Sequence, residues 1–234
     1  MRVASERDFL GDALVAPRRE GEIMPESDFL DALVDDLQPV RPAVPWASAM
    51  GIWILASGLF AAGAILIGGP PRPGLESDLA SPRLVIELSL VFATVFAMIA
   101  AGLEIGVPGA PATRRLLTPA VLLGLLWLGI MLLGDSLPGP ARSMLGKREH
   151  CLVEVLMISL PPTGLAFFLL RHRLMRIQWA AGALAGAAAS ALPAIGMQLA
   201  CMYEPEHALR FHYSPVVLIA LAGGIAGHFF LPHD

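Results

Sequence analysis

The stretch "VPWASAMGIWILASGLFAAGAILIG" (residues 44–68) contains no charged side chain and decides the fold class. A helix rises 1.5 Å per residue, so about 20 apolar residues cross the roughly 30 Å hydrocarbon core of a bilayer. Backbone amides in lipid must be satisfied within their own segment, so such a stretch is predicted to be helical. Five further apolar segments follow, at about 84–106, 117–135, 151–170, 177–200 and 213–232.

The overall composition supports the same class. Of the 234 residues, 56% are hydrophobic and 15% are charged, whereas soluble domains carry about 25% charged residues. The sequence therefore predicts an all-α integral membrane protein, a bundle of six transmembrane helices over residues 44–234. The net charge of −4 comes with an acidic N-terminal region and no basic stripe, so direct nucleic-acid binding is not expected.

The six spans place both termini on one side of the membrane. Basic residues near the span ends do not separate the two sides, because six lie on each. Arg2, Arg7, Arg18 and Arg19 in the N-terminal tail favour the cytoplasm for that side. The first 40 residues are polar and acidic, unlike a cleavable signal peptide. We therefore expect a multi-pass membrane protein with both termini cytoplasmic.

The two cysteines mark the fourth and fifth spans. Cys151 opens the fourth span, Cys201 closes the fifth, and the short loop "RHRLMR" (171–176) joins the two antiparallel segments. Each cysteine is separated from that loop by a helix of roughly 30–38 Å. Both sulfurs are therefore predicted to meet at the membrane face opposite the tail, where an oxidising exterior or periplasm permits a disulfide.

The polar link "CMYEPEHALRFHY" (201–213) raises a second possibility for the cysteines. Thiol and imidazole ligands suit zinc and cadmium-like ions. Five polar residues near the cysteines could complete a soft-metal site: His150, Glu204, Glu206, His207 and His212. No C-x2-C spacing supports a dedicated site, so no metal or other cofactor is assigned, and a plain structural disulfide is a third alternative.

Residues 1–43 form a polar tail with a predicted amphipathic helix at about 26–38. Ser27 is a suitable N-cap, and Pro39 ends the helix. Its apolar stripe follows helical spacing: Phe29, Leu30, Leu33, Val34 and Leu37. Its acidic side is made of Asp28, Asp31, Asp35 and Asp36. Membrane-surface helices are usually rich in Lys and Arg, so docking on a basic protein partner is favoured over a lipid surface or a free tail.

The first 23 residues allow two interpretations. "SERDFLGDALV" (5–15) is similar to "ESDFLDALV" (26–34) with Gly11 inserted, so it can be a second, weaker copy of the docking helix. Alternatively, Met24 is the true start and residues 1–23 are an upstream extension. Later in the chain, "GALAG" (182–186) and "GGIAG" (223–227) have the small-xxx-small spacing of close helix packing, which we expect within one bundle.

These features together resemble the NrsF family of six-span membrane anti-sigma factors. The resemblance runs from about residue 25 to the C-terminus. It rests on "DFLDALVDDLQPV" (28–40), on Cys151 with Cys201, and on the "C-x(11)-Y" frame that ends at Tyr213. The chain departs from the family in two places: "EPEH" (204–207) replaces the expected Asp-Ser-Pro, and His212 replaces the usual Trp.

The resemblance implies a partner and a mechanism. The tail would hold an extracytoplasmic-function (ECF) sigma factor at the inner membrane and keep it from RNA polymerase. The binding residues would be Asp28, Phe29, Leu30, Asp31, Leu33, Val34, Asp35, Asp36 and Leu37. A stress signal, such as an oxidant or a metal, would be sensed on the periplasmic side through Cys151 and Cys201 and would release the sigma factor.

Other functional classes fit the sequence less well. Transporters carry ionisable residues deep in their spans, whereas Glu87, Glu104 and Glu154 lie near span ends. No C-x-x-C, nucleophilic triad or phosphate-binding glycine loop is recognised, so no enzymatic activity is predicted. A small transporter, or a structural membrane subunit with a protein-docking tail, remains the alternative.

Overall fold

The computed structural model describes residues 34, 44–105, 113–133, 138–173 and 177–232. The chain divides into two units, Met1–Pro42 and Ala43–Asp234. The predicted docking helix at about 26–38 lies outside the described residues, except for Val34, and so does the similar segment 5–15.

The described part of the second unit is helical and has no strands. Its long helices are α2 (Trp46–Ile67), α4 (Pro82–Glu104), α5 (Thr113–Leu132), α6 (Cys151–Leu170), α7 (Gln178–Ala200) and α9 (Ser214–Phe230). Short elements are α3 (Leu75–Leu79), α8 (Pro205–His207) and the π-helix η3 (Ala208–Tyr213). Six helical stretches are long and apolar enough to cross a membrane. The predicted all-α, six-span fold class is therefore confirmed.

The sixth span differs from its predicted bounds. Its helical stretch begins at Pro205, earlier than the predicted start at residue 213, and passes through α8 and η3 into α9. Pro205 occupies the first turn, where its fixed φ suits a helix and its missing N–H costs no hydrogen bond. Residues 205–213, the larger part of "CMYEPEHALRFHY", are therefore helical and do not form an irregular loop.

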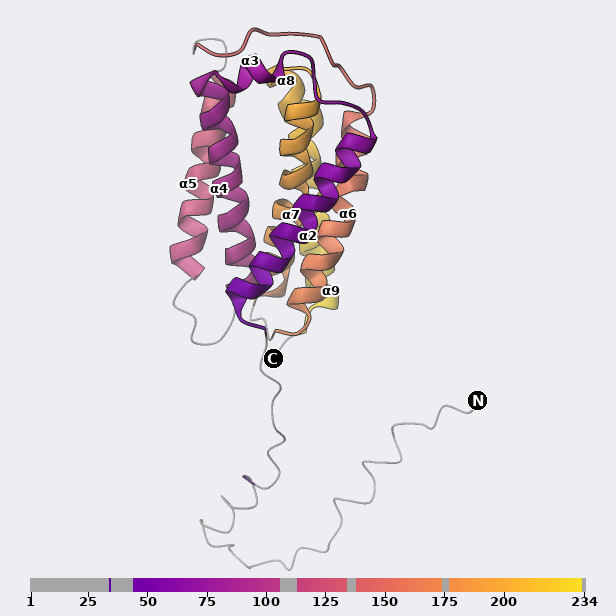
Figure 1. Ribbon diagram of the computed structural model, residues 1–234. Coiled ribbons are helices and arrows are strands. Elements are labelled where there is room, and N and C mark those ends of the chain that lie inside the picture. The colour runs from indigo at the N-terminus through magenta and orange to yellow at the C-terminus, as the bar shows by residue number, and fades with distance from the viewer. Residues whose placement is uncertain (1–33, 35–43, 106–112, 134–137, 174–176, 233–234) are drawn as a thin grey trace, which may run out of the picture. The chain divides into compact units, whose positions relative to one another are not determined.

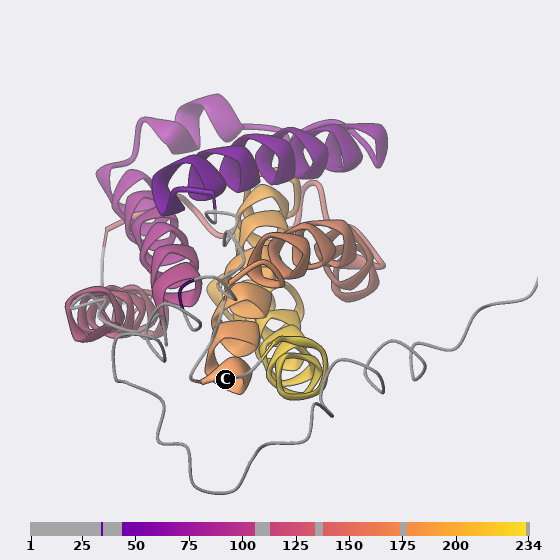
Figure 2. The same cartoon turned by 90° about the horizontal axis from the view of Figure 1, so that it is seen from below.

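Helix α7 is the centre of the bundle. It packs against α2, α4, α6 and α9, while α5 lies outside and packs mainly on α4 (Figures 1 and 2). Alanine and glycine make up most of α7, so its surface is thin and four neighbours can approach its backbone. Most of its residues are consequently buried.

The closest helix packing joins α7 and α9 through glycines. A Cβ at Gly223 would lie 2.5 Å from the carbonyl oxygen of Gly182, and a Cβ at Gly186 would lie 2.5 Å from that of Ile219. No side chain larger than hydrogen fits at such separations. The predicted role of the small-xxx-small segments, contact within one bundle, is confirmed.

The two ends of the bundle contain different short elements and loops (Figure 1). The chain reverses direction at each span, so the start of α6 and the end of α7 lie at the same end as α3 and α8. We call this end, which holds Cys151 and Cys201, the thiol end. The opposite end, where α2 begins at Trp46 and Arg171 follows α6, is the tail end because residues 1–43 precede it in the chain.

Candidate functional site: a buried thiol–imidazole cluster

The two cysteines meet at the thiol end. Cys151 is the first residue of α6, Cys201 is the C-cap of α7, and their Sγ atoms lie 3.3 Å apart. Both are free thiols, 2% and 0% exposed respectively. The predicted convergence of the sulfurs across the α6–α7 hairpin is therefore confirmed, while their role in sensing stays a prediction.

Cys151 is connected to helix α2 through Arg148. The Cys151 Sγ donates to the Arg148 carbonyl oxygen at 3.2 Å. The Arg148 guanidinium donates from Nη2 to the carbonyl oxygens of Ile65, at 3.3 Å, and Gly69, at 2.9 Å. Its Nη1 pairs with Glu154 Oε2 at 3.2 Å. Arg148 thus ties the C-terminal end of α2 to the first turn of α6, directly beside the thiol.

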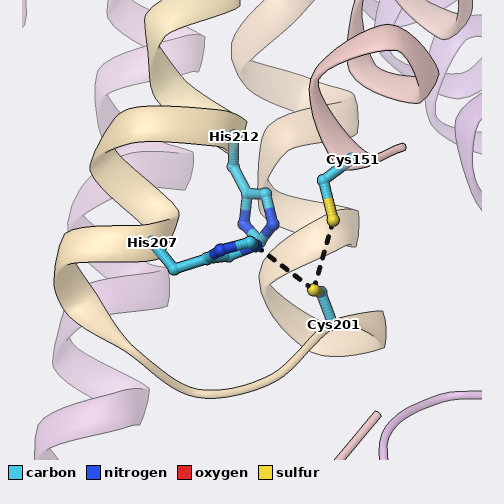
Figure 3. A group of neighbouring side chains, drawn as sticks. All are labelled: Cys151, Cys201, His207 and His212. Carbon is cyan, nitrogen blue, oxygen red and sulfur yellow. Dashed lines mark hydrogen bonds between the residues drawn. The ribbon is translucent and has the colours of Figure 1, made fainter. Parts of the chain in front are cut away.

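Two histidines complete a cluster around the sulfurs (Figure 3). His207 ends α8, and its Nε2 lies 3.6 Å from Cys201 Sγ; His212 comes from η3 and is 0% exposed. One donor atom from each of the four side chains lies within 4.8 Å of the other three. We call Cys151, Cys201, His207 and His212 the Cys–His cluster.

The hydrogen-bonding of Cys201 affects its protonation. Its contact with the Cys151 sulfur lowers the pKa of the Cys201 thiol against the opposing effect of burial. The thiolate is the form of cysteine that reacts with oxidants and binds metals. The sulfur pair is therefore chemically suited to change state, although it is shielded from solvent.

The other polar candidates lie outside this cluster. His150 is the exposed N-cap of α6 and does not contribute a donor atom to the cluster. Glu204 pairs with Arg142 at 3.3 Å, and Glu206 forms an exposed pair with Arg210 at 3.7 Å. Of the five polar residues considered from the sequence, only His207 and His212 join the cysteines.

A buried polar network lies beside the cluster, centred on Glu87. The Glu87 side chain is 0% exposed and accepts from Arg83 Nε at 2.7 Å. It also accepts from Gln198 Nε2 at 3.2 Å and from the Tyr203 hydroxyl at 3.1 Å. A buried carboxylate is stable only with such partners. This role of Glu87 was not predicted from the sequence; the available signal was Gln198, an amide near the end of the apolar α7.

The network reaches the backbone of Cys201. Arg72 Nη1 donates to the carbonyl oxygens of Gln198 and of Cys201, the latter at 3.4 Å. The Tyr213 hydroxyl donates to Gln198 Oε1 at 2.7 Å. Burial and the nearby Glu87 raise the pKa of Tyr203, so its hydroxyl keeps its proton and remains a donor. The position of Cys201 is therefore fixed by side chains from several elements.

At the tail end, Arg173 makes a separate connection. Its Nη2 donates to the Val44 carbonyl oxygen at 2.6 Å, and its Nη1 donates to the Leu103 carbonyl oxygen at 3.3 Å. Val44 lies two residues before the start of α2, and Arg173 lies three residues after the end of α6. Helix α6 therefore begins at the thiol pair and ends beside the residue at which the tail enters the bundle.

The fold and the Cys–His cluster define a multi-pass helical membrane protein with a chemically distinctive end. The chain belongs to the NrsF family: the family model, described as negative regulator of sigma F, matches residues 33–232. The resemblance recognised in the sequence is thus confirmed, and the chain is a negative regulator with a sigma factor as its partner class. No match was found among curated proteins or among solved structures.

Proposed function

We propose that the chain holds an ECF sigma factor at the bacterial inner membrane through its acidic tail helix and releases it when Cys151 and Cys201 change state. The observation that carries this proposal is the 3.3 Å approach of the two sulfurs at the thiol end, opposite the end at which the tail joins α2. A signal acting outside the cytoplasm would then be separated from its output by the length of the bundle.

The acidic tail helix would form the surface that binds the sigma factor. A sigma factor binds DNA and polymerase through basic and apolar surfaces, and an acidic helix with an apolar ridge is complementary to both. Each large side chain of the ridge, such as Phe29 or Leu33, contributes roughly 1.5–3 kcal/mol when fully buried. The aspartates, with Asp31 and Asp35 beside the ridge, contribute mainly association rate and choice of partner.

Pull-down of the cognate sigma factor by the membrane-bound full chain tests the tail. Leu33→Asp places a charge in the apolar ridge and is expected to abolish retention. Ala32→Asp is the matched control, because at about 100° per residue position 32 falls on the acidic side of the helix. Retention by Leu33→Asp equal to that by Ala32→Asp would remove the ridge from the mechanism.

Oxidation is one change of state available to the sulfur pair. A two-electron oxidant such as a peroxide would take two electrons from the two thiols, which lose two protons and form one S–S bond. The sulfurs would move from 3.3 Å to about 2.05 Å apart. Cys151 would also lose the S–H group that donates to the Arg148 carbonyl, and Arg148 holds the end of α2.

Two contacts would allow a movement of α6 to displace α2 and, through it, the tail. Arg148 binds α2 at the thiol end, and Arg173 binds the Val44 carbonyl at the tail end. A tilt or shift of α6 would therefore move α2 at both of its ends, and α2 continues directly into the tail. Helix displacement of this kind is an established way to couple distant sites.

Replacing both cysteines tests the sensing step. We expect the double variant Cys151→Ser, Cys201→Ser to bind the sigma factor normally and to fail to release it under oxidant or metal stress. The chain has two cysteines, so thiol trapping with a maleimide in the wild type reports on this pair alone. A full stress response in the double variant would rule out thiol sensing.

The sidedness on which the proposal depends has its own test. In the cysteine-free background, Met144→Cys places an exposed thiol in the segment that leads into Cys151, and Ser5→Cys places one in the tail. A membrane-impermeant maleimide added to intact spheroplasts should label position 144 and leave position 5 unlabelled until the membrane is opened. Labelling of both positions in intact spheroplasts would refute opposite compartments.

The alternative of a small transporter receives no support from the site. Glu87, the fully buried acidic side chain among the described residues, is neutralised by Arg83 and bonded by Gln198 and Tyr203. An ion pathway needs a titratable group with free access, and this carboxylate has none. No contact among the described residues favours the other alternative, a structural membrane subunit with a protein-docking tail.

A further inference from the structure

The donor atoms of the Cys–His cluster are spaced nearly as they are around a tetrahedrally coordinated metal ion. With metal–sulfur and metal–nitrogen bonds near 2.3 and 2.0 Å, tetrahedral coordination places neighbouring donor atoms about 3.3–3.8 Å apart. The Cys151–Cys201 sulfur separation is 3.3 Å, and the Cys201–His207 separation is 3.6 Å. All four donor atoms lie within 4.8 Å of one another. Small side-chain rotations would bring them to a common ion.

His212 provides an independent reason to expect a ligand. The side chain is 0% exposed, and neither Nδ1 nor Nε2 makes a hydrogen bond of normal geometry among the described residues, although the ring interacts with the Cys201 sulfur. A buried polar group without a partner is costly, and in the neighbouring network the Glu87 carboxylate, the Gln198 amide and the two tyrosine hydroxyls each have one. Figure 3 shows the His212 ring directed toward the sulfurs. A metal ion there would supply the missing partner.

The π-helix explains how two histidines five residues apart reach one site. In an α-helix, residues i and i+5 are separated by about 140° around the axis. In η3 (Ala208–Tyr213) the hydrogen bonds run from i to i+5, so His207 at its N-cap and His212 within it lie on nearly the same face. Single-turn π-helical segments are uncommon and are frequent at functional sites. The distortion places both imidazoles against the cysteines.

We propose that Cys151, Cys201, His207 and His212 bind one soft divalent cation, zinc or cadmium, in tetrahedral coordination. Two sulfurs and two imidazole nitrogens are a donor set that these ions prefer. On binding, each thiol gives up its proton to solvent, so two thiolates and one divalent cation form a neutral unit. Such a unit is suited to a site whose cysteines are shielded from water.

Metal binding would join three parts of the bundle through one shared ion. Cys151 belongs to α6, Cys201 to the end of α7, and the two histidines to the segment that leads into α9. Loss of the Cys151 proton also removes its donation to Arg148, the residue that holds the end of α2. The inference deepens the proposed sensing function by naming the chemical class of the signal, and it rests on that function only for its regulatory meaning.

Cobalt is a direct probe of this site because tetrahedral thiolate coordination gives Co²⁺ visible d–d bands and ultraviolet charge-transfer bands. The reduced full chain in detergent is titrated with Co²⁺ alone, followed by competition with Zn²⁺ and Cd²⁺. We expect one ion per chain, both sets of bands, and displacement by zinc and cadmium. Failure to develop the charge-transfer bands would overturn the proposal.

Histidine variants separate four ligands from a site made of sulfur alone. His207→Ala and His212→Ala should each weaken cobalt binding by about 100-fold or more and shift the d–d bands. His150→Ala is the matched control, because this exposed histidine is next to Cys151 in sequence but outside the cluster. His207 is only half-buried, so its variant should fold even if His212→Ala does not. Spectra unchanged in His207→Ala would refute the four-ligand site.

Sigma-factor retention by the same preparations distinguishes this inference from the proposed function. A chain that binds cobalt at the four residues but retains no sigma factor would refute the tail mechanism and leave the metal site standing. A chain that retains the sigma factor but gives no cobalt spectrum would refute the metal site and leave sequestration standing.

Discussion

The thiol end and the tail end of the bundle are held together by different kinds of contact. At the thiol end, buried side chains donate and accept in a network that links α4, α7, η3 and the segment before α3, with Glu87 and Gln198 at its centre. At the tail end, α7 and α9 meet through glycine backbones, and Arg173 bonds the Val44 carbonyl.

The hydrogen bonds at the thiol end depend on direction, whereas the backbone contacts at the tail end depend mainly on distance. Hydrogen bonds of a buried network require defined angles and reinforce one another, so a change at one atom alters its neighbours. Contacts between small residues depend on the close approach of two backbones and not on the angles of hydrogen bonds between side chains. The thiol end is therefore suited to register a chemical change, and the tail end is suited to move in response.

The largest effect should come from the centre of the thiol-end network. Glu87→Ala leaves Arg83, Gln198 and Tyr203 without their shared acceptor in a buried site. We expect a loss of about 3–5 kcal/mol in the free energy of unfolding, the usual cost of breaking a buried ion pair from one side. Unfolding of the purified chain in mixed detergent micelles measures it.

The matched control for this substitution is Glu206→Ala. Glu206 pairs with Arg210 on an exposed surface, with side chains 79% and 69% exposed. Exposed pairs contribute little to stability, so this variant should unfold like the wild type. Equal losses in the two variants would show that the buried network is not what holds the thiol end.

A smaller effect is expected from overpacking the tail end. Gly223→Ala places a methyl group 2.5 Å from the Gly182 carbonyl oxygen, so α9 must move away from α7. Overpacking of this kind costs about 1–3 kcal/mol in the free energy of unfolding. Gly164→Ala in α6 is the control, since nothing lies within 4 Å of its added Cβ. A fully stable Gly223→Ala chain would contradict close backbone contact there.

The smallest effect on stability, and the most informative one for coupling, is expected at Arg173. Arg173→Gln removes the donations to the Val44 and Leu103 carbonyls and should cost about 1–2 kcal/mol, since each hydrogen bond of a partly exposed side chain contributes about 1 kcal/mol or less. Sigma-factor retention should persist, while stress-induced release should decline. Arg171→Gln is the control, because Arg171 is exposed and lies over the Phe168 ring instead. Normal release in Arg173→Gln would exclude this contact from transmission.

The fold followed from the sequence with little ambiguity. Apolar segments of about 20 residues separated by proline, glycine and charge have few solutions in a bilayer, because every backbone amide must be bonded within the segment. The meeting of Cys151 and Cys201 followed from the same geometry, since two antiparallel helices of similar length return the chain to its starting depth. The glycine contacts followed from their spacing.

The site was only partly predictable. His150, His207 and His212 were equal candidates in the sequence, yet His150 is exposed while His212 is buried and directed at the sulfurs. The reason is the π-helix, which changes the angular position of every residue after Ala208 and has no simple signature in composition. Glu87 was likewise placed near a span end, where its partners on α7 and after it could not be seen.

The sequence by itself determined the class of the protein, the number of its spans, the face at which its thiols lie and its membership of a sigma-regulator family. The class, the spans and the position of the thiols depend on segment length, hydrophobicity and helical rise, whereas the family was indicated by motifs at residues 28–40, Cys151, Cys201 and Tyr213. Only the tertiary structure decided which polar side chains share the interior with the thiols. That choice depends on helix rotation and on a single π-turn, and an error of one residue in either would turn the imidazoles away from the sulfurs.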